Sequence, residues 1–186
     1  IHLDKPGGET MAPFRKLLET ADRQGLAVQI GYMYRHNPAV QLCLRAVREG
    51  WLGRVFEVHC VMSRMDGPDY RRWLAQFRGG AMYIFGSHLI DLVVTMLGQP
   101  DRVTPYLRRT WPERDDLLDN GLAVFEYPHA TATVRTAVVE VEGFRRRQLV
   151  VCGDRGTCDI QPLEYNGPHP RETVVRLTLA EPAGPY

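Results

Sequence analysis

Lysine is almost absent from this 186-residue sequence, in which Lys5 and Lys16 accompany 21 arginines. Arginine can replace lysine wherever a surface charge is sufficient, but not where a compact, titratable ammonium must fit a small site. Lys16 falls on the polar face of a predicted helix, where any cation would serve. We therefore take Lys5 as a candidate functional residue, against the alternative that it persists by chance.

Other absences exclude whole classes of function. The formal net charge is +1 and the charged residues are scattered, so the basic surface that neutralises phosphates is lacking and we expect no nucleic-acid partner. The longest strongly apolar run, residues 89–97, contains Asp91 and falls far short of the roughly 20 residues that cross a bilayer, so we expect no membrane partner. The four cysteines match no zinc or CxxC spacing and are expected to be reduced, mostly buried thiols in a cytoplasmic protein.

The first 37 residues predict a strand, a helix and a second strand. The opening apolar residues lead to Pro6, which has no N–H to donate to a ladder. A helix is predicted over residues 9–25, and the apolar run 26–34 is typical of a strand covered on both faces. Strand, helix and strand in so short a span indicate a parallel sheet, which two strands alone do not stabilise. Residues 1–37 are thus expected to be the last part of a doubly wound α/β domain whose earlier strands lie upstream of Ile1.

Residues 38–186 predict an α+β domain. Pro38 opens an amphipathic helix, a half-buried strand follows over residues 54–63, and residues 79–98 form an apolar helix. Alternating apolar and polar residues then predict strands at 102–109, 121–127, 130–141, 146–153, 157–162 and 173–179. This pattern favours one large, mainly antiparallel, open sheet with helices on one face.

The predicted helix around His88 carries a polar stripe in an otherwise apolar sequence. His88, Asp91 and Thr95 follow the i, i+3, i+7 spacing and share one face. A core histidine held by Asp91 is the competing interpretation. The sequence has no HExxH, no nucleophile elbow and no His/Cys cluster with metal spacing, so we expect neither a metal site nor a nucleophilic mechanism.

Three motifs in order resemble the glucose-fructose oxidoreductase and inositol dehydrogenase (Gfo/Idh/MocA) family: "DKP" at 4–6, "GYMYRHNP" at 31–38 and "GGAMYIFGSHLIDLVVTMLG" at 79–98. The resemblance implies a dinucleotide-binding Rossmann domain, here residues 1–37, followed by a catalytic α+β domain, residues 38–186. It also implies NAD or NADP as cofactor and oxidoreduction of a sugar, cyclitol or related small hydroxy or oxo compound. A homo-oligomer joined through the open sheet is implied as well.

The same resemblance assigns roles to particular residues. Lys5 would contact substrate and nicotinamide, with a cis bond to Pro6, and Arg35 would lie near the cofactor. His88 would be the general acid/base, and Asp91 could orient its ring from one turn away.

Two departures from the family pattern leave alternatives open. Ile84 stands where the family commonly has an aspartate four residues before the histidine, and the glycine-rich dinucleotide fingerprint is not in these 186 residues. One alternative is a noncatalytic ligand-binding or dimerisation module derived from the family. Another is a lyase or hydratase that forms a Schiff base on Lys5.

Overall fold

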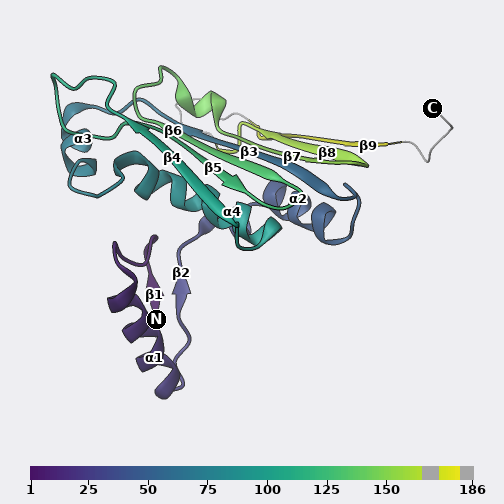
Figure 1. Ribbon diagram of the computed structural model, residues 1–186, viewed down its shortest axis with the longest axis horizontal. Helices are drawn as coiled ribbons and strands as arrows, with labels where there is room; N and C mark the ends of the chain where they lie inside the picture. The colour runs from purple at the N-terminus through teal and green to yellow at the C-terminus, as the bar shows by residue number, and fades with distance from the viewer. Residues whose placement is uncertain (165–171, 181–186) are drawn as a thin grey trace.

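The computed structural model describes residues 1–164 and 172–180, and no helix among them is long and apolar enough to cross a membrane. Figure 1 shows a small N-terminal unit beside a larger part built around a twisted sheet. The elements in chain order are β1 (His2–Leu3), α1 (Met11–Arg23), β2 (Gln29–Ile30), η1 (Met33–His36), α2 (Pro38–Arg48), β3 (Val55–Ser63), α3 (Pro68–Leu74), η2 (Met82–Gly86), α4 (Ser87–Leu97), β4 (Arg102–Arg108), β5 (Asn120–Glu126), β6 (Thr131–Ala137), η3 (Gly143–Arg146), β7 (Gln148–Gly153), β8 (Gly156–Gln161) and β9 (Val174–Leu179).

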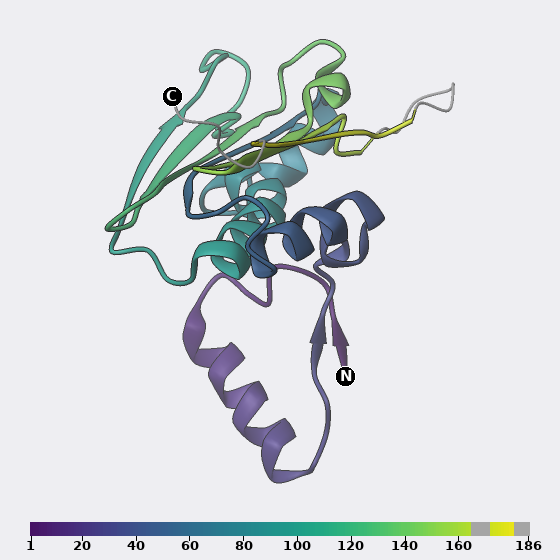
Figure 2. The ribbon, with the colours of Figure 1, turned by 90° about the vertical axis from the view of Figure 1, so that its right-hand side faces the viewer.

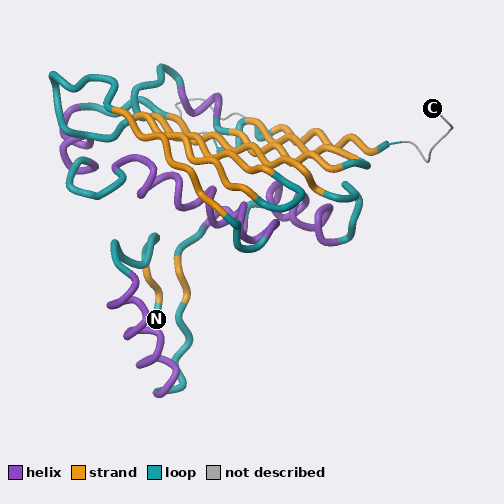
Figure 3. Tube along the Cα trace, in the orientation of Figure 1, coloured by secondary structure: helices purple, strands orange, loops and turns teal. Residues whose placement is uncertain are grey.

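Seven strands form one mixed sheet in the order β4-β5-β6-β3-β7-β8-β9 (Figure 3). Strands β3 and β6 pair in parallel, and the other neighbouring strands pair antiparallel. The prediction of a large, mainly antiparallel sheet is confirmed. The strand predicted over 130–141 is shorter in the structure: β6 ends at Ala137, and beyond it Val139 forms an isolated bridge with Met65.

Helices cover one face of this sheet, as predicted (Figure 2). Residues on the covered face alternate with half-buried residues on the open face. The fully buried side chains of the strands include Val58, Cys60, Ala132, Val134, Leu149, Val151, Cys158 and Ile160. All four cysteines are free thiols and three of them are buried, in agreement with the sequence.

The N-terminal unit is the expected parallel β–α–β arrangement, but the second strand was predicted too long. Only Gln29 and Ile30 pair with β1. Beyond them the Tyr32 N–H donates to Ile30 and the Met33 N–H to Gly31, so the chain turns into the 3-10 helix η1 instead of continuing to Tyr34 as a strand. The short helix α3 was not predicted at all.

A widened turn introduces the helix that carries His88. Residues Met82–Gly86 form a π-helical turn that continues directly into α4. Gly86 lets the Met82 side chain pack directly against the backbone, where a Cβ atom would displace the Met82 sulfur. At Gly80, φ is +50° and a Cβ atom would lie 2.6 Å from the Leu118 carbonyl oxygen. Gly80 and Gly86 therefore allow close packing at the start of this helix.

Candidate functional site

His88 lies in the first turn of α4 with 8% of its surface exposed. Its Nδ1 atom has no hydrogen-bond partner within residues 1–164 and 172–180. The Tyr34 ring packs edge-on to the imidazole, with the ring centroids 5.1 Å apart. A buried imidazole without a partner is unusual, because buried polar atoms are almost always hydrogen-bonded.

Burial and a neighbouring cation keep this imidazole neutral. Desolvation, followed by the positive charge of Lys5, lowers the pKa of His88 to about 4. At neutral pH the ring therefore has an unprotonated nitrogen that can accept a proton. The interpretation of His88 as a core histidine held by Asp91 does not fit this arrangement, since Asp91 pairs with Arg35 and none of the described residues bonds to the His88 Nδ1.

The ammonium group of Lys5 reaches the start of the same helix. Its Nζ donates a hydrogen bond to the main-chain carbonyl of Ile84, 79 residues away in sequence, and lies 6.0 Å from the centroid of the Phe85 ring. The Lys5–Pro6 bond is cis, as the family resemblance implied. Burial lowers the pKa of Lys5, and the Asp4 carboxylate partly opposes this shift.

The substitution at position 84 leaves the charge of Lys5 in place. The Ile84 side chain is buried and apolar, so this residue offers only its carbonyl oxygen to the ammonium. A carbonyl accepts a hydrogen bond without bringing the full negative charge of a carboxylate. The Lys5 charge therefore remains available to act on His88 and on a bound molecule.

Arg35 and Asp91 form a pair of their own. The Arg35 Nε lies 2.7 Å from one Asp91 carboxylate oxygen, and an Nη atom donates to the other. The guanidinium also lies 5.4 Å from the centroid of the Tyr32 ring. Asp91 thus supports Arg35, and the structure does not bring it to His88 as the sequence suggested.

A cavity of about 150 Å³ opens beside His88. Its lining residues are Met33, Tyr34, Met62, Arg64, Phe85, His88, Phe144, Arg147 and Glu164. On one wall the Tyr34 hydroxyl donates to Glu164, and the Arg147 Nη1 lies 2.7 Å from the same carboxylate. Burial, followed by the Glu164 charge, raises the pKa of Tyr34, so this phenol stays protonated.

Sequence analysis missed the charged residues of this cavity. Arg64 follows the end of β3, Arg147 precedes β7 and Glu164 follows β8, so they meet only when the sheet forms. Among 21 arginines nothing in the spacing distinguishes these two. The one available signal is position, because a charged residue directly after a buried strand is placed at the rim of the sheet.

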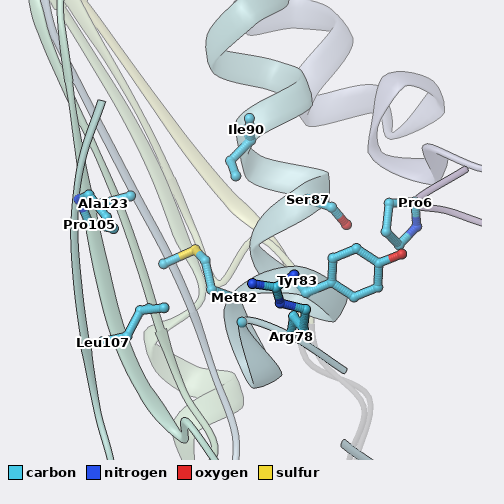
Figure 4. A pocket seen from close by; sticks show the side chains of 10 residues that line it. Pro6, Arg78, Met82, Tyr83, Ser87, Ile90, Pro105, Leu107 and Ala123 are labelled. Carbon is cyan, nitrogen blue, oxygen red and sulfur yellow. The ribbon is translucent and has the colours of Figure 1, made fainter. Parts of the chain in front are cut away.

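A second cavity, of about 260 Å³, lies on another face of the same helix. Ser87 lines it while the adjacent His88 lines the first. Figure 4 shows the Tyr83 ring directed toward Pro6 and the Met82 side chain directed toward the strands that carry Pro105 and Ala123. This cavity is largely apolar, and its titratable lining residues are Arg78 and Tyr83. In the described ranges no three His, Cys, Asp or Glu side chains are grouped so as to hold a metal ion.

The larger part of the structure is an α+β unit with helices on one face of an open sheet. A lysine and a histidine meet at the start of one of these helices. Together these features define a class of two-part α/β protein. Residues 40–159 match the GFO/IDH/MocA C-terminal domain, and the chain belongs to this family. The family inferred from the three sequence motifs is thereby confirmed.

Individual relatives agree with this membership. The uncharacterized oxidoreductase YhhX of Escherichia coli strain K12 is 28% identical over 165 residues, which cover 84% of this chain and 44% of the relative. A WlbA dehydrogenase from Bordetella pertussis, solved with NADH and UDP-GlcNAcA, has a TM-score of 0.82 at 21% identity, over 98% of this chain and 52% of that one. An inositol dehydrogenase homolog from Azotobacter vinelandii, solved with NADH and myo-inositol, has a TM-score of 0.77 at 19% identity, over 96% and 49%. These two likenesses show the fold, and the chain spans about half the length of the proteins it matches.

Proposed function

We propose that the full-length protein is an NAD(P)-dependent oxidoreductase acting on a sugar, cyclitol or related small hydroxy or oxo compound. The observation that carries this proposal is a neutral, unpartnered His88 under the charge of Lys5 beside a cavity. The names of the relatives support it, since they include dehydrogenases solved with NADH and either a nucleotide sugar acid or myo-inositol. In this proposal residues 1–37 form the last part of a Rossmann domain, and residues 38–186 form the catalytic and oligomerisation domain.

The residues at this site fit one end of a dinucleotide. A hollow of about 390 Å³ lies beside β2 and is lined in part by Tyr32 and Arg35, which offer an aromatic face and a cation. Arg35 would hold the nicotinamide end from this hollow, with Lys5 and Pro6 contributing from the loop after β1, and the pyrophosphate would need residues outside this chain. When bound, NAD(P) supplies the hydride acceptor or donor.

His88 and Lys5 provide the proton transfer and the charge stabilisation in the proposed reaction. In the oxidation, the hydroxyl proton of the substrate would pass to His88, while NAD(P)⁺, when bound, would take up the hydride from the same carbon. The products are the oxo compound, NAD(P)H and one proton. The neutral imidazole is in the correct form to accept that proton. The Lys5 ammonium stabilises the negative charge that develops on the oxygen, and the buried setting strengthens this interaction.

The open face of the sheet supports the proposed homo-oligomer. Its half-buried apolar side chains include Leu122, Val124 and Val150. A second copy of the chain would cover them, and sedimentation velocity of the full-length protein measures whether it does.

A noncatalytic, family-derived module is the second candidate, and Ile84 is the observation that favours it. With no carboxylate at this position the aspartate common in the family is absent, and a site of this kind could bind a ligand without turning it over.

Turnover and cofactor binding in the full-length protein separate these two functions. We expect NADH or NADPH to bind in calorimetry, and we expect reduction of NAD⁺ or NADP⁺, followed at 340 nm, with at least one member of a panel of sugars, sugar acids and cyclitols. The isolated 186-residue chain is expected to bind neither cofactor well, because its sequence has no pyrophosphate-binding fingerprint. Ligand binding without turnover of any compound would favour the noncatalytic module.

The pKa of His88 gives a further prediction. The charge of Lys5 lowers this pKa, so replacing Lys5 by Met is expected to raise it toward the ordinary value of 6.5. Histidine NMR titration of the protein without cofactor measures the shift, and a His88→Asn variant identifies the signal. An unchanged titration in Lys5→Met would show that the two side chains do not interact.

A further inference from the structure

We infer that the cavity beside His88 binds the carboxylate of an acidic substrate through Arg64, which makes the preferred substrate a small hydroxy acid of the sugar-acid type. This inference rests on the proposed oxidoreductase function and adds the class of substrate to it. Neither the motifs of the sequence nor the match of residues 40–159 assigns a role to Arg64.

The guanidinium of Arg64 is held in place but has few partners. It lies 5.0, 5.3 and 5.6 Å from the ring centroids of Tyr70, Phe85 and Phe144. Its Nε lies 2.6 Å from the Asp66 carboxylate, out of line for a hydrogen bond, and its Nη atoms have no hydrogen-bond partner among the described residues. Aromatic packing therefore fixes the group, while its Nη donors are left for a bound molecule.

Two further observations point to a ligand in the same cavity. Arg64 and His88 both line it, and the His88 Nδ1 is a buried polar atom without a partner. The Phe85 ring, which also lines this cavity, has its centroid 6.0 Å from the Lys5 Nζ and 5.3 Å from the Arg64 guanidinium. A molecule in the cavity would thus contact both His88 and the guanidinium of Arg64.

The charges of the surrounding groups favour a single negative charge on that molecule. Arg147 is engaged by Glu164 and by the Ser63 carbonyl, so it is already compensated. Arg64 has only the misaligned Asp66, whose own pKa is raised because burial outweighs the attraction of Arg64. A carboxylate matches the planar fork of an arginine in bidentate fashion. A phosphate dianion carries twice the charge of a carboxylate and would meet correspondingly stronger repulsion from Asp66 and Glu164.

Glu164 adds selectivity for hydroxyl groups. One of its oxygens accepts from Tyr34 and Arg147, and no described residue donates to the other. A substrate hydroxyl can donate to this second oxygen while its carboxylate binds Arg64. Together these groups describe a polyhydroxy acid whose reacting hydroxyl faces His88.

Matched pairs of compounds test this inference in the full-length protein with NAD⁺ and NADP⁺. The pairs are D-gluconate with D-glucitol and D-galacturonate with D-galactose, and D-glucose 6-phosphate tests the phosphate alternative. We expect kcat/KM for at least one acid to exceed that of its neutral partner about 10- to 100-fold, the range of a charged hydrogen-bonded contact. Arg64→Met should remove this preference and leave the neutral compound within a few-fold. Arg64→Lys keeps the charge beside Asp66 but loses the fork, so the preference should fall even if Arg64→Met does not fold.

Arg78→Met is the matched control, because Arg78 lines the second cavity and not the one that holds His88. It should leave the acid preference unchanged. Equal rates for acids and neutral compounds, a preference for the phosphate, or equal losses for both members of a pair in Arg64→Lys would overturn the inference. If no compound is turned over, calorimetry with D-gluconate and D-galacturonate decides the matter separately. Binding that Arg64→Lys weakens would preserve the carboxylate site while the proposed function fails, and no binding would remove both.

Discussion

Replacing Lys5 by Met, or His88 by Asn, is expected to lower kcat of the full-length enzyme about 100-fold or more. A positioned acid or base contributes about 10²–10⁴-fold and a group that stabilises a developing oxyanion about 10²–10³-fold. Both contributions arise in the transition state, so kcat and kcat/KM should fall together and KM should change little. Steady-state kinetics with the best substrate of the panel measures this.

The chain provides a matched control for each substitution. Lys16 is the other lysine and packs among helix residues away from His88, so Lys16→Met should retain normal turnover. His129 is exposed, and His129→Asn should do the same. Lys5→Arg tests why lysine was kept, because it preserves the charge but not the compact ammonium, and we expect it to remain at least about 10-fold below the wild type. Near-normal turnover in both Lys5→Met and His88→Asn would refute the proposed roles.

The dependence of folding stability on acidic pH gives a separate prediction about His88. Burial lowers the pKa of His88 in the folded protein to about 4, below its ordinary 6.5. Between these values the unfolded chain binds the proton and the folded one does not. Folding stability should therefore fall as pH drops from 6.5 toward 4, and His88→Asn should flatten this slope.

Where the fold depends on the local alternation of apolar and polar residues, it could be predicted from the sequence. Alternation in β3 and β5 to β9 reports one buried and one open face, and it located these strands to within a few residues. The strand predicted over 26–34 failed because an apolar run does not specify where pairing stops. Only Gln29 and Ile30 find a partner in β1, and the chain turns after them.

The candidate site, like the fold, has residues that could be predicted from the sequence and residues that could not. Lys5 could be proposed because lysine is rare, and His88 because a polar stripe interrupts an apolar helix; the structure brings both to the start of the same helix. The partner of Asp91 was assigned wrongly because helical spacing reports which side chains share a face and not which distant side chain arrives there. Arg35 arrives from the segment after β2 and takes the carboxylate. Arg64 and Glu164 could not be found from the sequence, because only the assembled sheet brings them together.

A buried arginine of α3 gives the largest expected effect on stability. The Arg71 side chain is 4% exposed and lies 2.7 Å from Asp115 and 2.9 Å from Asp119, whose own side chain is fully buried. Arg71→Met would leave two carboxylates without their counter-charge. Breaking a buried ion pair on one side costs about 3–5 kcal/mol, which urea unfolding of the full-length protein measures for the domain that contains the sheet.

The neighbouring residue supplies the control for this substitution. Arg72 is exposed and pairs with the exposed Asp69, so Arg72→Met should cost less than about 1 kcal/mol. The hydrogen bond from Arg71 also lowers the pKa of Asp115, and this contributes stability above the unfolded pKa that is lost as pH falls through the lower folded value. The acid sensitivity of the wild type should therefore be weaker in Arg71→Met. Equal losses for Arg71→Met and Arg72→Met would mean that the buried network contributes no more than a surface pair.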